Sequence, residues 1–219
     1  MDEPAALIRL EGVTFAYDGR PPVLEDLDFT LAPGERAGLI GPNGSGKTTL
    51  FHLIMGLLRP KAGRVEVFGR ERRVEADFRE VRAGIGFVFQ DADDQLFCPT
   101  VAEDVAFGPL NLGATHAQAR ALVKETLDLL GLSGFEDRIT YKLSGGEKKL
   151  VSLATVLSMK PKVLLLDEPT AGLDEETAGR LSRVLLDIGL PFLVISHDRE
   201  FLARTTTSLY KVTNRRITM

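Results

Sequence analysis

The nine residues GPNGSGKTT, from Gly41 to Thr49, constrain the fold of this chain most strongly. They match the P-loop pattern G-x-x-x-x-G-K-[ST], follow the apolar pair Leu39 and Ile40, and open an apolar-periodic segment. Glycines let backbone N–H groups turn inward around phosphate, and the N-terminus of a following helix adds partial positive charge. The motif therefore predicts a strand, a phosphate-binding loop and a helix in that order.

The rest of the chain is typical of an α/β fold. The apolar runs VLLLD and FLVIS do not alternate, as expected of parallel strands covered on both faces. Other β-type runs are VTFAY, RAGLI, RVEVFG, IGFVFQ and SLYKV, and helical patterns between them are GKTTLFHLIMGLL, HAQARALVKETLDLLG, GEKKLVSLATVLS and EETAGRLSRVLLDIG. We expect a single domain, 1–219, with its core at 1–90 and 161–219 and a helical subdomain at about 91–160.

Composition limits the possible partners and compartment. A net charge of −4 gives no electrostatic reason to expect a nucleic-acid partner. The start MDEPAALIRL lacks the order of a signal peptide, and no run approaches the ~18 apolar residues of a membrane span. The single cysteine, Cys98, allows no internal disulfide and is interpreted as a half-buried thiol. We expect a soluble protein of the cytoplasm.

The P-loop and a pair of acidic residues together predict chemistry on a nucleoside triphosphate. Lys47 would bind the β and γ phosphates, and the Thr48 hydroxyl is placed for Mg²⁺. The strand VLLLDE ends in Asp167, which would hold Mg²⁺ directly or through water, and in Glu168, which could act as a general base toward water. The base-reading motif N-K-x-D of GTPases is absent from the sequence.

A second glycine-rich turn, Ser144-Gly145-Gly146-Glu147, leaves two interpretations open. It is a capping box, with Ser at the N-cap and Glu at the third helical position. A cap does not need two glycines, however, and each costs roughly 1 kcal/mol relative to Ala in a helix. Glycines there would let a phosphate from elsewhere approach the backbone N–H groups.

The order of these motifs resembles the ABC-type ATPases. LSGGE (143–147) resembles the family signature, Gln90 the Q-loop glutamine, AGLD (171–174) the D-loop and His197 the switch histidine. Tyr17 matches the aromatic residue that stacks on adenine, and Phe15 aligns less well. The resemblance implies a RecA-like P-loop NTPase core, with a mostly parallel sheet, an antiparallel N-terminal β part and a helical subdomain.

The same resemblance implies a head-to-tail dimer, expected to be a homodimer, with ATP and Mg²⁺ at its interface. The catalytic residues would be Glu168, His197 and Gln90, and the metal ligands Thr48, Gln90 and Asp167. The nucleotide-binding residues would be Tyr17, Gly41, Pro42, Asn43, Gly44, Ser45, Gly46, Lys47, Thr48 and Thr49, with Ser144, Gly145 and Gly146 serving the partner's ATP.

One signature residue departs from the family, because Glu147 stands where Gln is commonest. Its negative charge would slightly weaken attraction for the partner's γ-phosphate unless Lys148 or Lys149 screens it. The histidines His52 and His116 are interpreted as ordinary helix or surface residues.

The segment FQDADDQLFCPTVAEDVAFGPLNLG (89–113) resembles the energy-coupling-factor (ECF) importers, although Ala92 replaces the usual proline. In that group the segment forms a groove for the membrane subunit, and we expect Leu96 to be exposed in it. The resemblance implies a coupling subunit and a substrate-binding membrane subunit as partners, at the cytoplasmic face of the membrane.

The type of importer stays open. The chain ends soon after its last strand, without the added C-terminal segment of many vitamin-type members, which favours cobalt or nickel over a vitamin such as biotin. A soluble ABC ATPase acting on nucleic acid or ribosomes is the other alternative. It is disfavoured by the acidic charge and by the absence of a coiled-coil insertion or a second ATPase domain.

Overall fold

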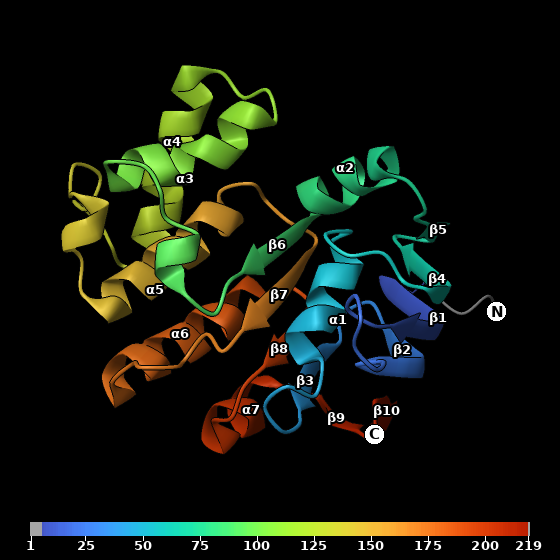
Figure 1. Ribbon diagram of the computed structural model, residues 1–219. Coiled ribbons are helices and arrows are strands. Elements are labelled where there is room, and N and C mark those ends of the chain that lie inside the picture. The colour runs from blue at the N-terminus through green and yellow to red at the C-terminus, as the bar shows by residue number, and fades with distance from the viewer. Residues whose placement is uncertain (1–5, 219) are drawn as a thin grey trace.

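The P-loop begins at one edge of the larger of two sheets. The computed structural model describes residues 6–218 and places six strands in the order β10-β9-β3-β8-β7-β6 (Figure 1). All neighbours are parallel except β9 and β10, which form a hairpin. The strands are β3 (Arg36–Ile40), β6 (Ile85–Val88), β7 (Val163–Asp167), β8 (Phe192–Ile195), β9 (Ser208–Thr213) and β10 (Arg216–Thr218). Every residue of β6, β7 and β8 is buried, which explains their unbroken apolar sequences.

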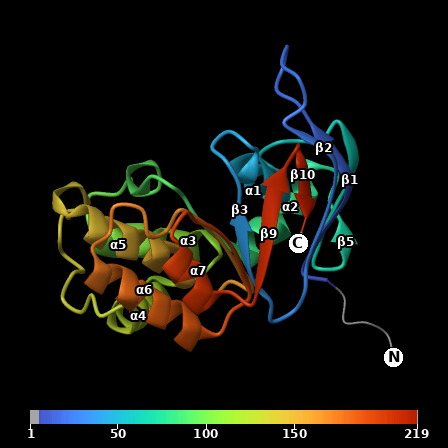
Figure 2. The ribbon, with the colours of Figure 1, turned by 90° about the horizontal axis from the view of Figure 1, so that it is seen from below.

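A smaller antiparallel sheet is formed by the N-terminal part of the chain. Its order is β2-β1-β4-β5, with β1 (Ile8–Phe15), β2 (Leu24–Leu31), β4 (Ala62–Val67) and β5 (Arg70–Glu71). The hairpin β9–β10 lies against β2, where Arg215 pairs with Glu25 at 3.0 Å and Arg216 pairs with Asp26 at 3.0 Å (Figure 2). A mostly parallel sheet with an antiparallel N-terminal part confirms the predicted fold class.

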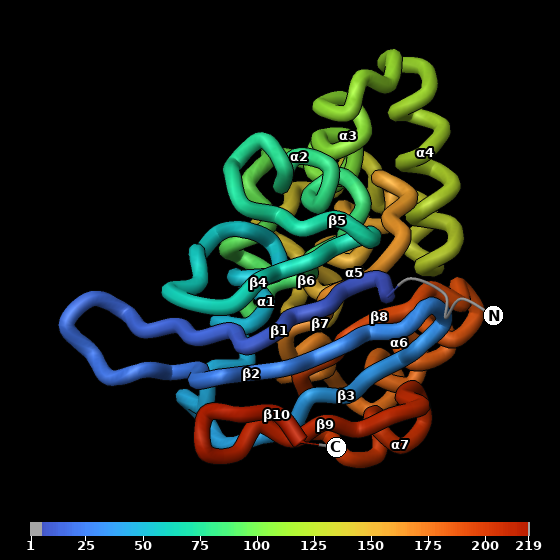
Figure 3. Tube along the Cα trace, turned by 90° about the vertical axis from the view of Figure 1, so that its right-hand side faces the viewer, coloured from blue at the N-terminus to red at the C-terminus, as the bar shows by residue number. Residues whose placement is uncertain are grey.

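Helix α1 (Lys47–Ile54) lies between the two sheets (Figures 1 and 3). Its residues Phe51 and Leu50 belong to one buried cluster with Leu10 of the small sheet and Leu39 of the large one. The P-loop that precedes α1 is therefore held by the core from both sides.

The segment between β6 and β7 is helical. It contains α3 (Val101–Asn111), α4 (His116–Leu129) and α5 (Gly145–Leu157), which gather at the end of the molecule opposite the small sheet (Figures 1 and 2). A second buried cluster joins these helices to α6 (Glu175–Ile188) and to β7 and β8. Each of α3, α4 and α5 begins with a capping box, at Thr100, Thr115 and Ser144. The division into core and helical subdomain stays a prediction.

Strand register brings the functional segments to one edge of the large sheet. Ile195 of β8 is level with both Leu39 of β3 and Asp167 of β7. The P-loop, Glu168 and the segment that leads to His197 therefore all leave the sheet at its carboxyl edge. Ligands of open α/β sheets bind at this edge.

Several elements differ from the sequence prediction. Helices α2 (Glu75–Gly84), α3 and α7 (Arg199–Thr205) and strand β2 were not predicted, because their apolar residues are few or interrupted by charged ones. The first helix is shorter than predicted and stops at Ile54, just before Gly56 at φ +69°. Within residues 6–218, no helix has both the length and the apolar character needed to cross a membrane.

Candidate active site

The P-loop is closed on itself by its own lysine. Lys47 Nζ donates to the carbonyl oxygens of Gly41 at 2.8 Å and Pro42 at 3.0 Å. Burial lowers the pKa of Lys47, and the nearby carboxylates of Glu168 and Asp167 oppose that shift. Gly46 has φ +99°, and a Cβ there would lie 2.7 Å from Leu24 Cδ2, so this position requires glycine. The ammonium group is thus held inside the P-loop, where phosphate oxygens could replace the two carbonyl oxygens as hydrogen-bond acceptors.

A hydroxyl and a carboxylate meet directly beyond the P-loop. Thr48 Oγ1 donates to Asp167 Oδ2 at 2.7 Å, across 119 positions of sequence. Asp167 is only 2% exposed, and this burial raises the pKa of its carboxyl, while Thr48 and Lys47 lower it. Hydroxyl and carboxylate oxygens are the ligands that Mg²⁺ prefers, usually together with substrate phosphates. Within residues 6–218, no cluster of three or more His, Cys, Asp or Glu side chains could hold a metal alone.

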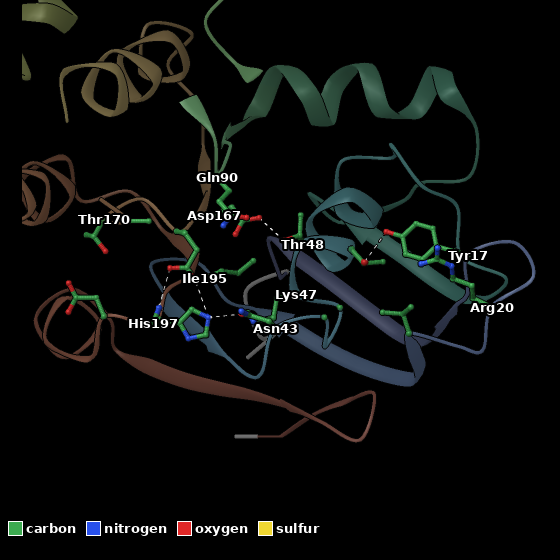
Figure 4. Close-up of a pocket in the computed structure, with 17 residues that line it drawn as sticks. Tyr17, Arg20, Asn43, Lys47, Thr48, Gln90, Asp167, Thr170, Ile195 and His197 are labelled. Carbon is green, nitrogen blue, oxygen red and sulfur yellow. Dashed lines mark hydrogen bonds and ion pairs between the residues drawn. The ribbon is translucent and has the colours of Figure 1, made fainter. Parts of the chain in front are cut away.

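Glu168 is held in an unusual backbone conformation beside His197. Its φ is +47°, which is uncommon for a residue with a side chain and is often found at functional sites. Its Oε2 accepts from the His197 backbone N–H at 3.2 Å, and its Oε1 lies 3.4 Å from His197 Nε2. His197 Nε2 also lies 3.2 Å from Asn43 Oδ1 of the P-loop (Figure 4). Burial raises the pKa of Glu168, which makes the carboxylate a better proton acceptor once ionised.

One cavity of about 840 Å³ unites most of the predicted residues (Figure 4). Tyr17 lies in its lining, 39% exposed, with its hydroxyl 3.1 Å from Thr49 Oγ1. Phe15, the alternative aromatic, is 6% exposed and packs edge-to-face with Tyr17 at 5.0 Å. The cavity is lined by Tyr17, Arg20, Val23, Asn43, Gly44, Gly46, Lys47, Thr48, Thr49, Gln90, Asp167, Glu168, Thr170, Ala171, Ile195, His197 and Asp198. Of the predicted P-loop residues, Gly41, Pro42 and Ser45 lie outside this lining.

The second glycine turn lies outside this cavity. Ser144 Oγ accepts from Glu147 N at 3.3 Å, and Glu147 Oε2 accepts from Ser144 N at 2.8 Å, so the capping box is formed. A Cβ built on Gly145 meets nothing within 4 Å, and one on Gly146 meets only ordinary contacts. Nothing among residues 6–218 therefore requires glycine at Gly145.

The Glu147 carboxylate is paired with an arginine rather than with either neighbouring lysine. Arg138 Nη1 lies 2.9 Å from Glu147 Oε1, and the Arg138 guanidinium lies 3.5 Å from the Phe135 ring centroid. Lys148 instead pairs with Asp93 Oδ1 at 2.5 Å, and Lys149 donates to backbone carbonyls. Arg138 belongs to no motif and precedes the capping box on an irregular segment, so sequence reasoning did not identify it.

The expectation that Leu96 is exposed is wrong. Leu96 is 8% exposed and belongs to the second buried cluster, whereas the next residue, Phe97, is 66% exposed. Phe97 packs edge-to-face with Phe107 of α3, with ring centroids 4.8 Å apart. Alongside them runs a groove of about 740 Å³, lined largely by apolar residues of α3 and α4 and including Phe107.

The remaining residues singled out in the sequence fall outside the main cavity. His52 is half-buried on α1 and faces a neighbouring pocket that Asp167 also lines, and burial lowers its pKa. His116 is exposed at the start of α4. Cys98 is a half-buried free thiol whose pKa burial and Asp104 raise to about 11.

Comparisons with known proteins agree with these motifs. A family model described as ABC transporter matches residues 24–171. The energy-coupling factor transporter ATP-binding protein EcfA of Methanothermobacter thermautotrophicus is 44% identical over 202 residues, which cover 90% of this chain and 65% of that protein.

Two solved structures have closely similar folds. CbiO1 from Clostridium perfringens, part of the ABC transporter complex cbiONQ, has a TM-score of 0.89 and 31% identity, covering 98% of this chain and 88% of that one. The ATP-binding cassette MJ0796, in a dimeric post-hydrolysis state with ADP and Pi, has a TM-score of 0.87 and 25% identity, covering 97% of each chain.

Proposed function

Because this chain belongs to the ABC transporter ATP-binding family, we propose that it hydrolyses ATP to power an importer of the energy-coupling-factor type. The observation that carries the proposal is the single cavity in which P-loop residues Lys47 and Thr48 face Asp167, Glu168 and His197. Phosphate-binding, metal-binding and base functions therefore have residues within one space. A binding module without hydrolysis would not need Glu168.

Nucleotide binding would exchange internal contacts for contacts to phosphate. Lys47 would transfer its hydrogen bonds from the Gly41 and Pro42 carbonyls to the β and γ phosphates. Thr48 and Asp167 fit Mg²⁺ as oxygen ligands, with the Gln90 side chain as a further ligand from the cavity wall. When bound, the metal would supply positive charge that neutralises the phosphates.

Glu168 would accept the proton of the attacking water. Its side chain is 13% exposed and lines the cavity directly after β7, where φ is +47°. His197, held between Glu168 and Asn43, would orient the carboxylate and donate toward developing charge on the γ-phosphate.

Replacing Glu168 by Gln tests the base assignment. Glu168→Gln keeps the shape of the side chain but removes the charge that accepts a proton, so turnover should fall by about 10²–10⁴-fold. Nucleotide titration should show unchanged ATP binding. Near-normal steady-state hydrolysis by the purified variant would remove Glu168 from this role.

We further infer a head-to-tail homodimer, in which α5 contributes to the partner's ATP site. The support is that Ser144 and Gly145 do not line the chain's own cavity, while Gly145 leaves open space at a helix N-terminus. Mixing a Lys47→Ala subunit with a Ser144→Arg subunit tests this arrangement. One composite site would then be intact, so ATP-dependent dimerisation or hydrolysis should return, although neither variant alone supports it.

Controls for subunit exchange and folding make a negative result of this mixing experiment informative. If the subunits exchange and remain folded but neither activity returns, the signature does not act in trans. The capping box would then be the sufficient explanation of Ser144 and Glu147.

The partners we propose are a membrane coupling subunit and a substrate-binding membrane subunit, with this chain peripheral at the cytoplasmic face. Residues between Gln90 and Gly108 would contact the coupling subunit, where Phe97 is exposed beside the apolar groove. Cobalt or nickel is the proposed cargo, supported by the likeness to CbiO1 of the cbiONQ complex. Uptake of labelled cobalt, nickel and biotin by the reconstituted complex distinguishes this cargo from a vitamin.

A further inference from the structure

Lys149 connects α5, the helix that carries the second glycine turn, with the segments that follow strands β6 and β7. Its ammonium group donates to the carbonyl oxygen of Gln90 and lies 3.4 Å from the carbonyl oxygen of Glu168. The side chains of Gln90 and Glu168 line the main cavity, whereas Lys149 itself does not. Lys149 therefore contacts the backbone of two proposed catalytic residues from outside the cavity.

The surroundings of Lys149 favour a fixed position for its charge. Lys149 is half-buried, and burial lowers its pKa, while Asp91, Asp167 and Glu168 oppose that shift. The Glu168 carbonyl also accepts from Ala171 N at 3.1 Å, so it sits in a turn rather than in a sheet ladder. The Glu168 N–H donates to Ile195 O of β8 at 2.9 Å, so the Lys149 contact is one of several restraints on the Glu168 backbone.

Other contacts hold the same segment to α5 independently of Lys149. Gln95 Oε1 accepts from Phe89 N at 3.0 Å, and Gln95 Nε2 donates to Ser152 O at 2.9 Å and Thr155 Oγ1 at 2.8 Å. Lys148 adds its ion pair with Asp93. Removing the Lys149 ammonium should therefore leave α5 packed and disturb only the carbonyls of Gln90 and Glu168.

We propose that Lys149 is a positioning residue for ATP hydrolysis, which fixes the backbone of Gln90 and Glu168 relative to α5. The inference rests on the proposed roles of Gln90 and Glu168 in hydrolysis. A small misplacement of a catalytic group can cost about a hundredfold in rate without loss of binding. Because α5 also carries Ser144 and Gly145, Lys149 links the helix facing the partner's nucleotide to the groups that act on the chain's own.

The test uses three variants of the full chain. Lys149→Met keeps side-chain length but removes the donor, and should lower kcat by about tenfold or more while KM for ATP and nucleotide affinity stay unchanged. Lys149→Arg keeps the donors and should retain most of the turnover. Lys148→Met is the matched control, because it removes the ion pair between Lys148 and Asp93 of the same segment. The Asp93 carboxylate is largely exposed, so this change should alter kcat by less than about twofold.

Three results would overturn the proposal. These are an unchanged kcat in Lys149→Met, an equal loss in Lys149→Arg and Lys149→Met, and an equal loss in Lys148→Met. If thermal melting shows that Lys149→Met is unfolded, the comparison of Lys149→Gln with Lys149→Arg replaces it. Glu168→Gln separates the two levels of inference: normal turnover in that variant rejects the proposed role of Glu168 in hydrolysis, whereas loss there with normal turnover in Lys149→Met rejects only the role of Lys149.

Mixed dimers show which subunit's Lys149 affects hydrolysis at the intact site. In the pair made of Ser144→Arg and Lys47→Ala subunits, the Ser144→Arg subunit supplies the P-loop, Gln90 and Glu168 of the intact site. Adding Lys149→Met to that subunit should lower the restored hydrolysis, while adding it to the Lys47→Ala subunit should not. Equal losses from both subunits would contradict positioning within one chain.

Discussion

At the residue scale, Phe15 and Tyr17 have similar side chains but different surroundings, because Phe15 ends strand β1 and Tyr17 lies just beyond it. Tyr17 is 39% exposed in the cavity lining, whereas Phe15 is buried in the core. Base–aromatic stacking contributes roughly 1–3 kcal/mol, so Tyr17→Ala should weaken ATP binding by about 5-fold to 150-fold. Tyr17→Phe loses only the contact with Thr49 and should bind nearly as well. Fluorescent-nucleotide titration measures both, and equal affinities for all three proteins would return Tyr17 to a packing role.

The site residues that belong to motifs could be predicted from the sequence, whereas residues whose contacts arise only from tertiary packing could not. Thr48 and Asp167 meet because a P-loop and an acidic strand end must share the carboxyl edge of a parallel sheet, and both facts were visible in the sequence. Arg138 was missed, and Lys149 was considered only as a screen for Glu147, since a basic residue outside a motif carries no periodic or spacing signal. Their contacts depend on how α5 packs against the segment after β6.

At the element scale, α5 begins with glycines that the chain's own packing does not explain. Gly145 has an ordinary backbone conformation and open space around its Cα. Gly145→Ala should therefore keep or raise the free energy of unfolding, because Ala favours a helix by up to about 1 kcal/mol over Gly. If a phosphate of the ATP bound by the partner subunit approaches the Gly145 backbone, the added methyl group should weaken ATP-dependent dimerisation. Light scattering in the Glu168→Gln background measures that dimer.

Gly179→Ala is the matched control, because Gly179 lies on α6 and also has no neighbour within 4 Å of a built Cβ. It should stabilise the fold similarly and leave the dimer unchanged. If Gly145→Ala and Gly179→Ala behave alike in the dimer assay, close approach to Gly145 is contradicted.

The elements themselves were predicted unevenly, for physical reasons. The fully buried strands β7 and β8 and the amphipathic helix α6 have strong apolar patterns, and they were found. Helix α2 reads EADFREVRAG and buries only Phe78 and Val81, so its sequence resembles a polar loop. Helix α3 was obscured by Gly108 and Pro109 near its end, although its capping box at Thr100 was a usable signal.

At the scale of the whole molecule, the proposed membrane-facing surface and the α5 part of the proposed dimer interface both lie on the helical end and are physically connected. The segment at Pro99–Ala102 is hydrogen-bonded to the segment that precedes α5: Thr140 N donates to Pro99 O at 3.1 Å, and Val101 N donates to Arg138 O at 3.1 Å. Buried Asp104 accepts from both Cys98 N and Thr140 Oγ1. A membrane subunit seated beside Phe97 would therefore press on the same unit that presents Ser144.

A charge at Phe97 tests the membrane-facing surface without touching the catalytic cavity. Phe97 is 66% exposed, and its backbone is held by a hydrogen bond from its N–H to Asp104 Oδ1 at 3.1 Å, so Phe97→Arg should fold normally. Because a desolvated unpaired guanidinium is costly in an apolar interface, co-purification with the membrane subunits and transport should both fall. ATP hydrolysis by the isolated chain should persist. Leu129→Arg, at an equally apolar and 51% exposed position at the end of α4, should leave assembly intact. Intact assembly and transport in Phe97→Arg would place the membrane contact elsewhere on the chain.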